Sequence, residues 1–181
     1  MMIPTQPRAA PRPSALADRF SRIRQRSTEL AGPLSPEDCQ VQSMPDTSPT
    51  KWHLAHVTWF FETFVLERFE PGFTPFDPAF RVLYNSYYQG IGERHPRPQR
   101  GMVTRPSLDE VKRYRRNVDE RIHTLLTTTP ADADRDEIIE LGLHHEQQHQ
   151  ELLLTDIKHV FSLNPMAPAY ARRWPMITVQ P

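Results

Sequence analysis

The stretch LGLHHEQQHQELLL, residues 141–154, holds three of the chain's eight histidines. It lies within a long predicted helix that runs from about Asp132 to Phe161. Successive helical residues are about 100° apart, so His145 and His149 project from one face, one turn apart. Two imidazoles in this arrangement can reach the same metal ion. Because two ligands rarely hold a divalent ion well enough for catalysis, we expect a third ligand from another element.

The segment KWHLAHVTW, residues 51–59, supplies two candidates for that third ligand. His53 and His56 lie about one turn apart on a predicted helix that is otherwise apolar. A histidine buried on such a helix would be costly without a partner. If this helix faces the 132–161 helix across a bundle core, either histidine could complete a three-histidine site.

The neighbours of the His145 and His149 pair carry different expectations. Glu151 projects about 200° away from His149, which favours a supporting or surface role. Gly142 lies one turn before His145, and a glycine inside a helix costs about 1 kcal/mol relative to alanine. We therefore expect Gly142 to make room for a ligand or for a facing helix. The remaining histidines of this half of the chain are expected to be structural or exposed: His123, His144 and His159.

A protease interpretation competes for the same pair, because residues 145–149 match the H-E-x-x-H pattern of zinc proteases with Glu146 as general base. The extended pattern fails, since Leu152 replaces its glycine and Thr155 its histidine. No glutamate follows Glu151, and no strand is predicted that could form the sheet usual in such proteases. The sequence disfavours this class.

The composition bounds the class of protein. The 181 residues are enough for one domain with a core, and 22 basic residues balance 22 acidic ones. A net charge of zero argues against nucleic-acid or membrane binding driven by charge. Cys39 is the single cysteine, which is typical of a reducing, cytoplasmic setting. No apolar run is long enough for a membrane span, and the first residues lack the apolar core of a secretory signal.

Periodicity and capping residues predict four substantial helices and no strand. The first covers residues 14–31, and the second covers 50–69, with Ser48 as its cap and Pro49 at its first position. The second helix is apolar on most of its circumference, which implies deep burial. Ser107 and Glu110 form a predicted capping box for the third helix, which extends to about Leu126.

These elements predict an all-α, four-helix bundle. A long crossover rich in Pro, Gly and Arg, residues 70–106, joins helices two and three; it holds a short helix near residues 77–88 and a loop, GIGERHPRPQRG. The expected organisation is a disordered tail over 1–13, a metal-binding bundle over 14–165 and a Pro-rich tail over 166–181.

Three separated segments, SPTKWHLAHVTWFFETF, NSYYQGIGERHPRPQRG and LHHEQQHQELLLTDIKH, closely resemble the N-terminal domain of the ergothioneine-biosynthesis sulfoxide synthases, or hercynine oxygenases. The resemblance covers roughly residues 15–165 and implies a DinB-like four-helix bundle. It implies a mononuclear non-haem iron(II), Fe(2+), site on three histidines: His56, which matches better than His53, together with His145 and His149. It also implies that Arg94 and Arg97, in the ERHPR segment, bind the carboxylates of a thiol substrate.

In the family that the chain resembles, the iron binds O2 and hercynine, and a thiol is joined to the imidazole ring of hercynine as a sulfoxide. The thiol is γ-glutamylcysteine or cysteine. Family members continue into a second domain that resembles formylglycine-generating enzymes and supplies catalytic residues. We expect the part of the active site that this second domain supplies to come from a further domain after Pro181 or from a partner chain. Two other interpretations remain open: a stand-alone DinB-like zinc domain acting as a thiol transferase, and a non-enzymatic interaction module that uses the Pro-rich ends.

Overall fold

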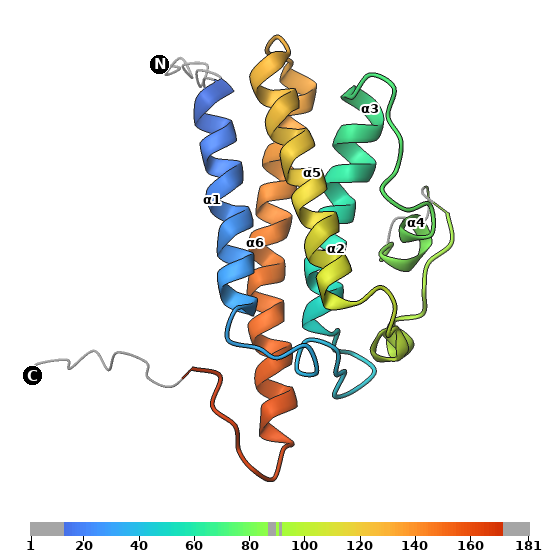
Figure 1. The fold of residues 1–181 in the computed structure, drawn as a ribbon, viewed down its shortest axis with the longest axis vertical. Coiled ribbons are helices and arrows are strands. Elements are labelled where there is room, and N and C mark those ends of the chain that lie inside the picture. Colours follow the sequence, from blue (N-terminus) through green and yellow to red (C-terminus); the bar gives the residue numbers. More distant parts are fainter. Residues whose placement is uncertain (1–12, 87–89, 91, 172–181) are drawn as a thin grey trace, which may run out of the picture.

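The computed structural model describes residues 13–86, 90 and 92–171, and within them four long helical segments form a bundle (Figure 1). These segments are α1 (Pro13–Ala31), a rod that begins with α2 (Thr50–Phe61), α5 (Leu108–Thr128) and α6 (Ala133–Ser162). The rod and α5 run in the same direction, opposite to α1 and α6, so a long connection must join them. No strand occurs in this part of the chain, and the predicted all-α four-helix bundle with its long crossover is confirmed. Residues 1–12 of the expected N-terminal tail and most of the Pro-rich C-terminal segment lie outside the described residues, and Pro13 is the first residue of α1.

The second predicted helix is one continuous rod with an irregular middle. After α2 come a π-helical turn, η1 (Glu62–Leu66), and the short α3 (Glu67–Phe69). The sequence predicted a regular helix here and missed the π-helical turn. Every residue of α2 is buried, as its apolar circumference predicted. Helices α5 and α6 both pack on α2, and α1 packs on the same two helices from the other side.

The crossover covers the outer flank of the rod, which explains how α2 can be buried all round (Figure 1). It contains α4 (Phe80–Leu83), within the short helix predicted near residues 77–88. It also contains a 3-10 helix, η3 (Arg97–Met102), in the segment where the sequence predicted only loop. Lys51 donates hydrogen bonds to two of its carbonyl oxygens, those of Val103 and Pro106, both at 2.9 Å. The crossover is therefore fastened to the helix that carries the WHLAH segment.

The two predicted helix starts differ in outcome. Ser107 and Glu110 form the predicted capping box at the start of α5. The prediction for α2 was wrong, because Pro49 occupies the cap position and no side chain caps the helix. Ser48 is used otherwise: its backbone N–H donates to Asp156 at 2.8 Å, and its hydroxyl accepts from Arg100 at 2.9 Å. Tertiary partners have taken the groups that a capping serine would use.

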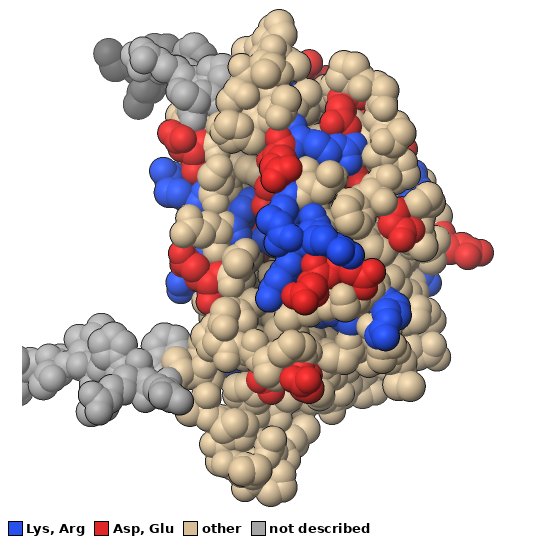
Figure 2. All heavy atoms as spheres, viewed as in Figure 1, with Lys and Arg blue, Asp and Glu red and all other residues tan. Residues whose placement is uncertain are grey.

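The surface carries charges of both signs. On the face shown in Figure 2, basic and acidic side chains are interspersed, in keeping with the zero net charge. Within the part of the chain that the structure describes, no helix combines the length and apolar composition needed to cross a membrane.

Candidate metal centre

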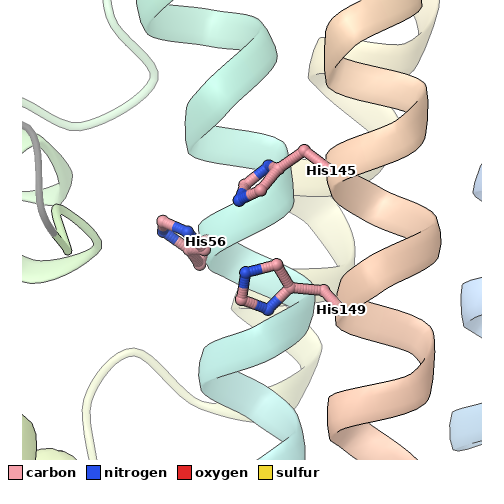
Figure 3. A group of neighbouring side chains, drawn as sticks. All are labelled: His56, His145 and His149. Atoms are coloured by element: carbon pink, nitrogen blue, oxygen red, sulfur yellow. The ribbon is translucent and has the colours of Figure 1, made fainter.

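Three histidines from two helices converge between α2 and α6 (Figure 3). His56 comes from α2, and His145 and His149 come from successive turns of α6. One ring nitrogen of each lies within 4.8 Å of those of the other two. The ring centroids are 4.6–5.0 Å apart. We call these three histidines the triad. Each of them can reach a single ion placed among them.

Gly142 allows the two helices to approach closely enough for this. A Cβ atom at Gly142 would lie 2.6 Å from Cε1 of Phe61 and 2.8 Å from Cε1 of Phe60. No real Cβ atom sits so close to a carbon, so the aromatic rings of α2 occupy the space that a side chain would need. The expectation that Gly142 makes room for a facing helix agrees with this packing.

A hydrogen bond fixes the tautomer of His56 and leaves one ring nitrogen that could bind a metal. Its Nδ1 lies 2.7 Å from the backbone oxygen of Tyr84. A carbonyl oxygen only accepts, so Nδ1 must carry the proton and Nε2 keeps its lone pair. Nδ1 of His145 is buried and has no hydrogen-bond partner among the described residues. A buried nitrogen without a hydrogen-bond partner, next to two other imidazoles, fits a site that could hold a metal ion.

The triad is held in the neutral form that metal binding requires. Burial, together with the neighbouring His145, lowers the pKa of His56 well below its ordinary value. Burial lowers the pKa of His145 to about 4, although Glu146 opposes this shift. Burial and the nearby imidazoles also lower the pKa of His149 far below its ordinary range. At neutral pH, protons therefore do not compete with a metal for these lone pairs.

A cavity of about 270 Å³ opens over the triad and is lined in part by Trp52, Gln148, Arg97 and Arg100. A second cavity, of about 480 Å³, is lined by Arg94, His95 and the same two arginines. Ser86, Arg97 and Arg100 line both cavities, so the two adjoin. The crossover thus places guanidinium groups beside the triad, where carboxylates of a ligand could be bound.

The two predicted arginines differ in their positions. Of the two cavities, Arg94 lines the second and not the one over the triad, and it donates to the backbone oxygen of Ser86 at 2.9 Å. Arg97 lines both cavities, and its guanidinium also donates to the backbone oxygen of Asp46. Their role toward a substrate stays a prediction.

Arg100 is a candidate that sequence reasoning missed. It is 5% exposed, and its guanidinium carbon lies 3.4 Å from the centre of the Trp52 ring. Of the three arginines that line the two cavities, Arg100 is the buried one, and it lines the cavity above the triad. The signal was present as a second arginine three residues after Arg97, one turn along the same 3-10 helix.

Glu146 cannot serve as the base that the protease interpretation requires. Its carboxylate is fully buried and lies 2.9 Å from Arg24 and 3.1 Å from Arg115. It also accepts a 2.6 Å hydrogen bond from Ser27. Burial alone would raise the pKa of Glu146, but the two guanidiniums outweigh burial and hold it below its ordinary value. The glutamate of the H-E-x-x-H pattern is a structural anion of the bundle core.

The other side chains considered from the sequence do not belong to the triad. His123 and His144 are exposed, and so is Glu151, which leaves it the surface role. Nδ1 of His159 lies 2.7 Å from the Ser43 hydroxyl. His53, the alternative to His56, contacts His149 and Asp156 and does not belong to the triad.

Comparison with known proteins agrees with this architecture. The family model described as DinB superfamily matches residues 19–153, which is well over half of the chain. The matched range contains all of the triad and both arginine-lined cavities. Comparison with individual curated proteins gives no match.

Proposed function

This chain belongs to the DinB superfamily, and we propose that it holds one iron(II) ion on His56, His145 and His149. We propose further that it is the iron-binding domain of an O2-dependent sulfoxide synthase that joins a thiol to hercynine. The thiol would be γ-glutamylcysteine or cysteine. A metal site as such agrees with the superfamily, whose members bind metals. Iron and the sulfoxide reaction rest on the sequence resemblance together with the geometry of the cavities.

One observation carries the proposal: the three segments that resemble the synthases meet at one place. WHLAH lies on α2, HHEQQH lies on α6, and the ERHPRPQR segment leads into η3. Side chains from all three line the cavity over the triad: Trp52, His56, Arg97, Arg100, His145 and His149. Segments that serve only the packing of separate helices would have no reason to converge on a cavity lined by histidines and arginines.

The donor set suits the proposed chemistry. Three neutral imidazoles leave several positions open on a six-coordinate ion, enough for a thiolate, an imidazole and O2. Bound iron(II) would supply the activation of O2. The chain's own groups would hold the ion, bind substrate carboxylates through the arginines, and shield the site with Trp52. In the overall reaction, a thiol S–H and an imidazole C–H bond break, and a C–S bond forms. One oxygen atom of O2 ends on sulfur and the other leaves as water.

The chain offers no thiol of its own to this reaction. Cys39 is fully buried, and burial raises its pKa to about 11, so it carries almost no thiolate at neutral pH. An inert Cys39 supports a small-molecule thiol that enters the cavity as the sulfur donor. Such a donor fits an arginine-lined entrance, since amino-acid thiols carry carboxylates.

A zinc-dependent thiol transferase is the runner-up, because an all-imidazole set also suits zinc. The test is metal content after anaerobic purification, followed by O2 uptake and sulfoxide formation with hercynine and each thiol. We expect about one iron per chain, and O2 uptake that requires both organic substrates. The assay is run with and without the second domain of a related synthase, because the resemblance implies that such a domain or a partner chain completes the site. Zinc with thiol transfer and no O2 uptake would refute the synthase, and absence of any metal would favour an interaction module.

A further inference from the structure

A line of hydrogen-bonded groups supports His149 from behind. Nδ1 of His149 lies 2.9 Å from Nδ1 of His53, and Nε2 of His53 lies 3.0 Å from Oδ2 of Asp156. The same carboxylate oxygen accepts the backbone N–H of Ser48 at 2.8 Å. His53 is 3% exposed, so water does not compete for these bonds. The line joins the start of α2 to the last turns of α6.

The spacing of the residues produces this line. His149 and Asp156 are seven residues apart on α6, so two helical turns bring them onto one face. His53 projects from α2 into the gap between them, three residues before the triad member His56. Each ring nitrogen of His53 therefore meets one side chain of α6.

The protons on this line have one arrangement when the imidazoles are neutral. The Asp156 carboxylate only accepts, so Nε2 of His53 carries the proton. Nδ1 of His53 then has a lone pair and must accept a hydrogen bond from Nδ1–H of His149. His149 is left with its lone pair on Nε2, the nitrogen that remains for the triad.

We propose that His53 and Asp156 are positioning residues of the metal centre, which fix His149 in the tautomer that presents Nε2 to the ion. The inference rests on the proposed metal site, but its first prediction concerns the protein without metal. Metal-bound histidines commonly donate their other N–H to a carboxylate or carbonyl, and here a second histidine stands between. His56 has the same support directly, from the backbone oxygen of Tyr84.

The direct test is nitrogen-15 NMR of the histidine rings in the metal-free wild-type chain, at a pH where the imidazoles are neutral. We expect His149 with its proton on Nδ1 and His53 with its proton on Nε2. Histidine without such partners prefers the proton on Nε2, so the expected state of His149 is the uncommon one. Finding His149 protonated on Nε2 would overturn the proposal. This measurement needs no iron and no activity, so its outcome is independent of the sulfoxide synthase function.

Two substitutions test the consequence for binding, with Co(II) and Zn(II) affinities measured by competition. His53→Leu fills the space but accepts no hydrogen bond, and we expect affinity to fall roughly tenfold to a hundredfold. His53→Asn places an amide oxygen near the position of Nδ1, and we expect it to recover most of that loss. Equal losses in the two variants, or wild-type affinity in His53→Leu, would refute the positioning role. His144→Leu, an exposed change on α6, the helix that carries His149, is the control and should bind as wild type does.

Discussion

Replacing Glu146 with alanine should strongly destabilise the bundle, although this residue lies between two of the proposed metal ligands. Its carboxylate is fully buried and is held by two guanidiniums and a hydroxyl. Arg24 and Arg115, the two cationic partners, are 2% and 4% exposed. The substitution would leave two buried cations facing each other without the anion between them. Arg24 retains its 2.6 Å pair with Asp119, which limits the loss.

The magnitude follows from the cost of an uncompensated buried charge. Removing one partner of a buried ion pair costs about 3–5 kcal/mol. A domain's free energy of unfolding is typically about 5–15 kcal/mol, so the variant would lose a large share of it. With a urea slope of about 2 kcal/mol per molar, the unfolding midpoint should fall by about 2 M. The assay is urea unfolding followed by circular dichroism, with both midpoint and slope fitted.

The matched control is Glu140→Ala, on the same helix. Glu140 pairs with Arg19 at 3.1 Å, but both side chains are about 30% exposed. Such surface pairs contribute about 0–1 kcal/mol, so the midpoint should hardly change. If Glu146→Ala unfolds within about 1 kcal/mol of the control, the structural role assigned to Glu146 is wrong.

The same carboxylate should make stability depend on pH. Its pKa in the folded chain lies below the ordinary carboxyl value, since Arg24 and Arg115 outweigh the effect of burial. A depressed pKa stabilises the fold at pH values above the unfolded carboxyl's pKa. This contribution is lost as the pH falls through the folded pKa. Wild type should therefore lose stability with acid more steeply than Glu146→Gln, as measured by urea unfolding from neutral pH down to about pH 3.

Three further predictions concern the site. Alanine at any triad position should lower metal affinity by more than the roughly tenfold to hundredfold expected of a supporting residue, whereas His144→Ala should not; isothermal titration with Zn(II) measures both. Arg94→Ala and Arg97→Ala should each weaken thiol binding roughly tenfold, through a lost charge-assisted hydrogen bond, with metal stoichiometry unchanged. If thiol affinity is unchanged in both, these arginines leave the proposed site. Gly142→Ala gains about 1 kcal/mol of helix propensity but costs about 1–3 kcal/mol by overpacking against Phe60 and Phe61, so thermal unfolding should show no net stabilisation.

Local patterns in the sequence were enough to predict the bundle. The helix at Ser107 begins where its capping box predicts, because both partners lie within one turn. The pairing of His145 and His149 likewise follows from helical spacing alone. The choice between His53 and His56 did not follow from spacing, since both lie on a buried helix. It depends on the rotation of α2 against α6, which the resemblance indicated and the periodicity could not.

Features that depend on distant partners were missed for the same reason. Ser48 has the sequence of a helix cap, yet Arg100 and Asp156, far away in the chain, use its polar groups. The π-helical turn over Glu62–Leu66 has no local signal in the sequence. In the sequence, Arg100 looks like any other loop arginine, and only the folded crossover places it against the Trp52 ring. Long-range contacts decide how Ser48 is used and where Arg100 lies.

Helix α2 links the arginine-bearing loop of the crossover, residues 84–102, to the proposed metal ligands. Nδ1 of His56 donates to the backbone oxygen of Tyr84, at the start of the loop, and Trp52 supports Arg100 near its end. Lys51 holds the segment that follows, at Val103. Three of the first seven residues of α2 therefore fix both the tautomer of one triad histidine and the position of the arginine-bearing loop. This double role explains why every residue of α2 is buried. A helix covered on every side can hold a proposed metal ligand and a proposed binding loop in one rigid frame.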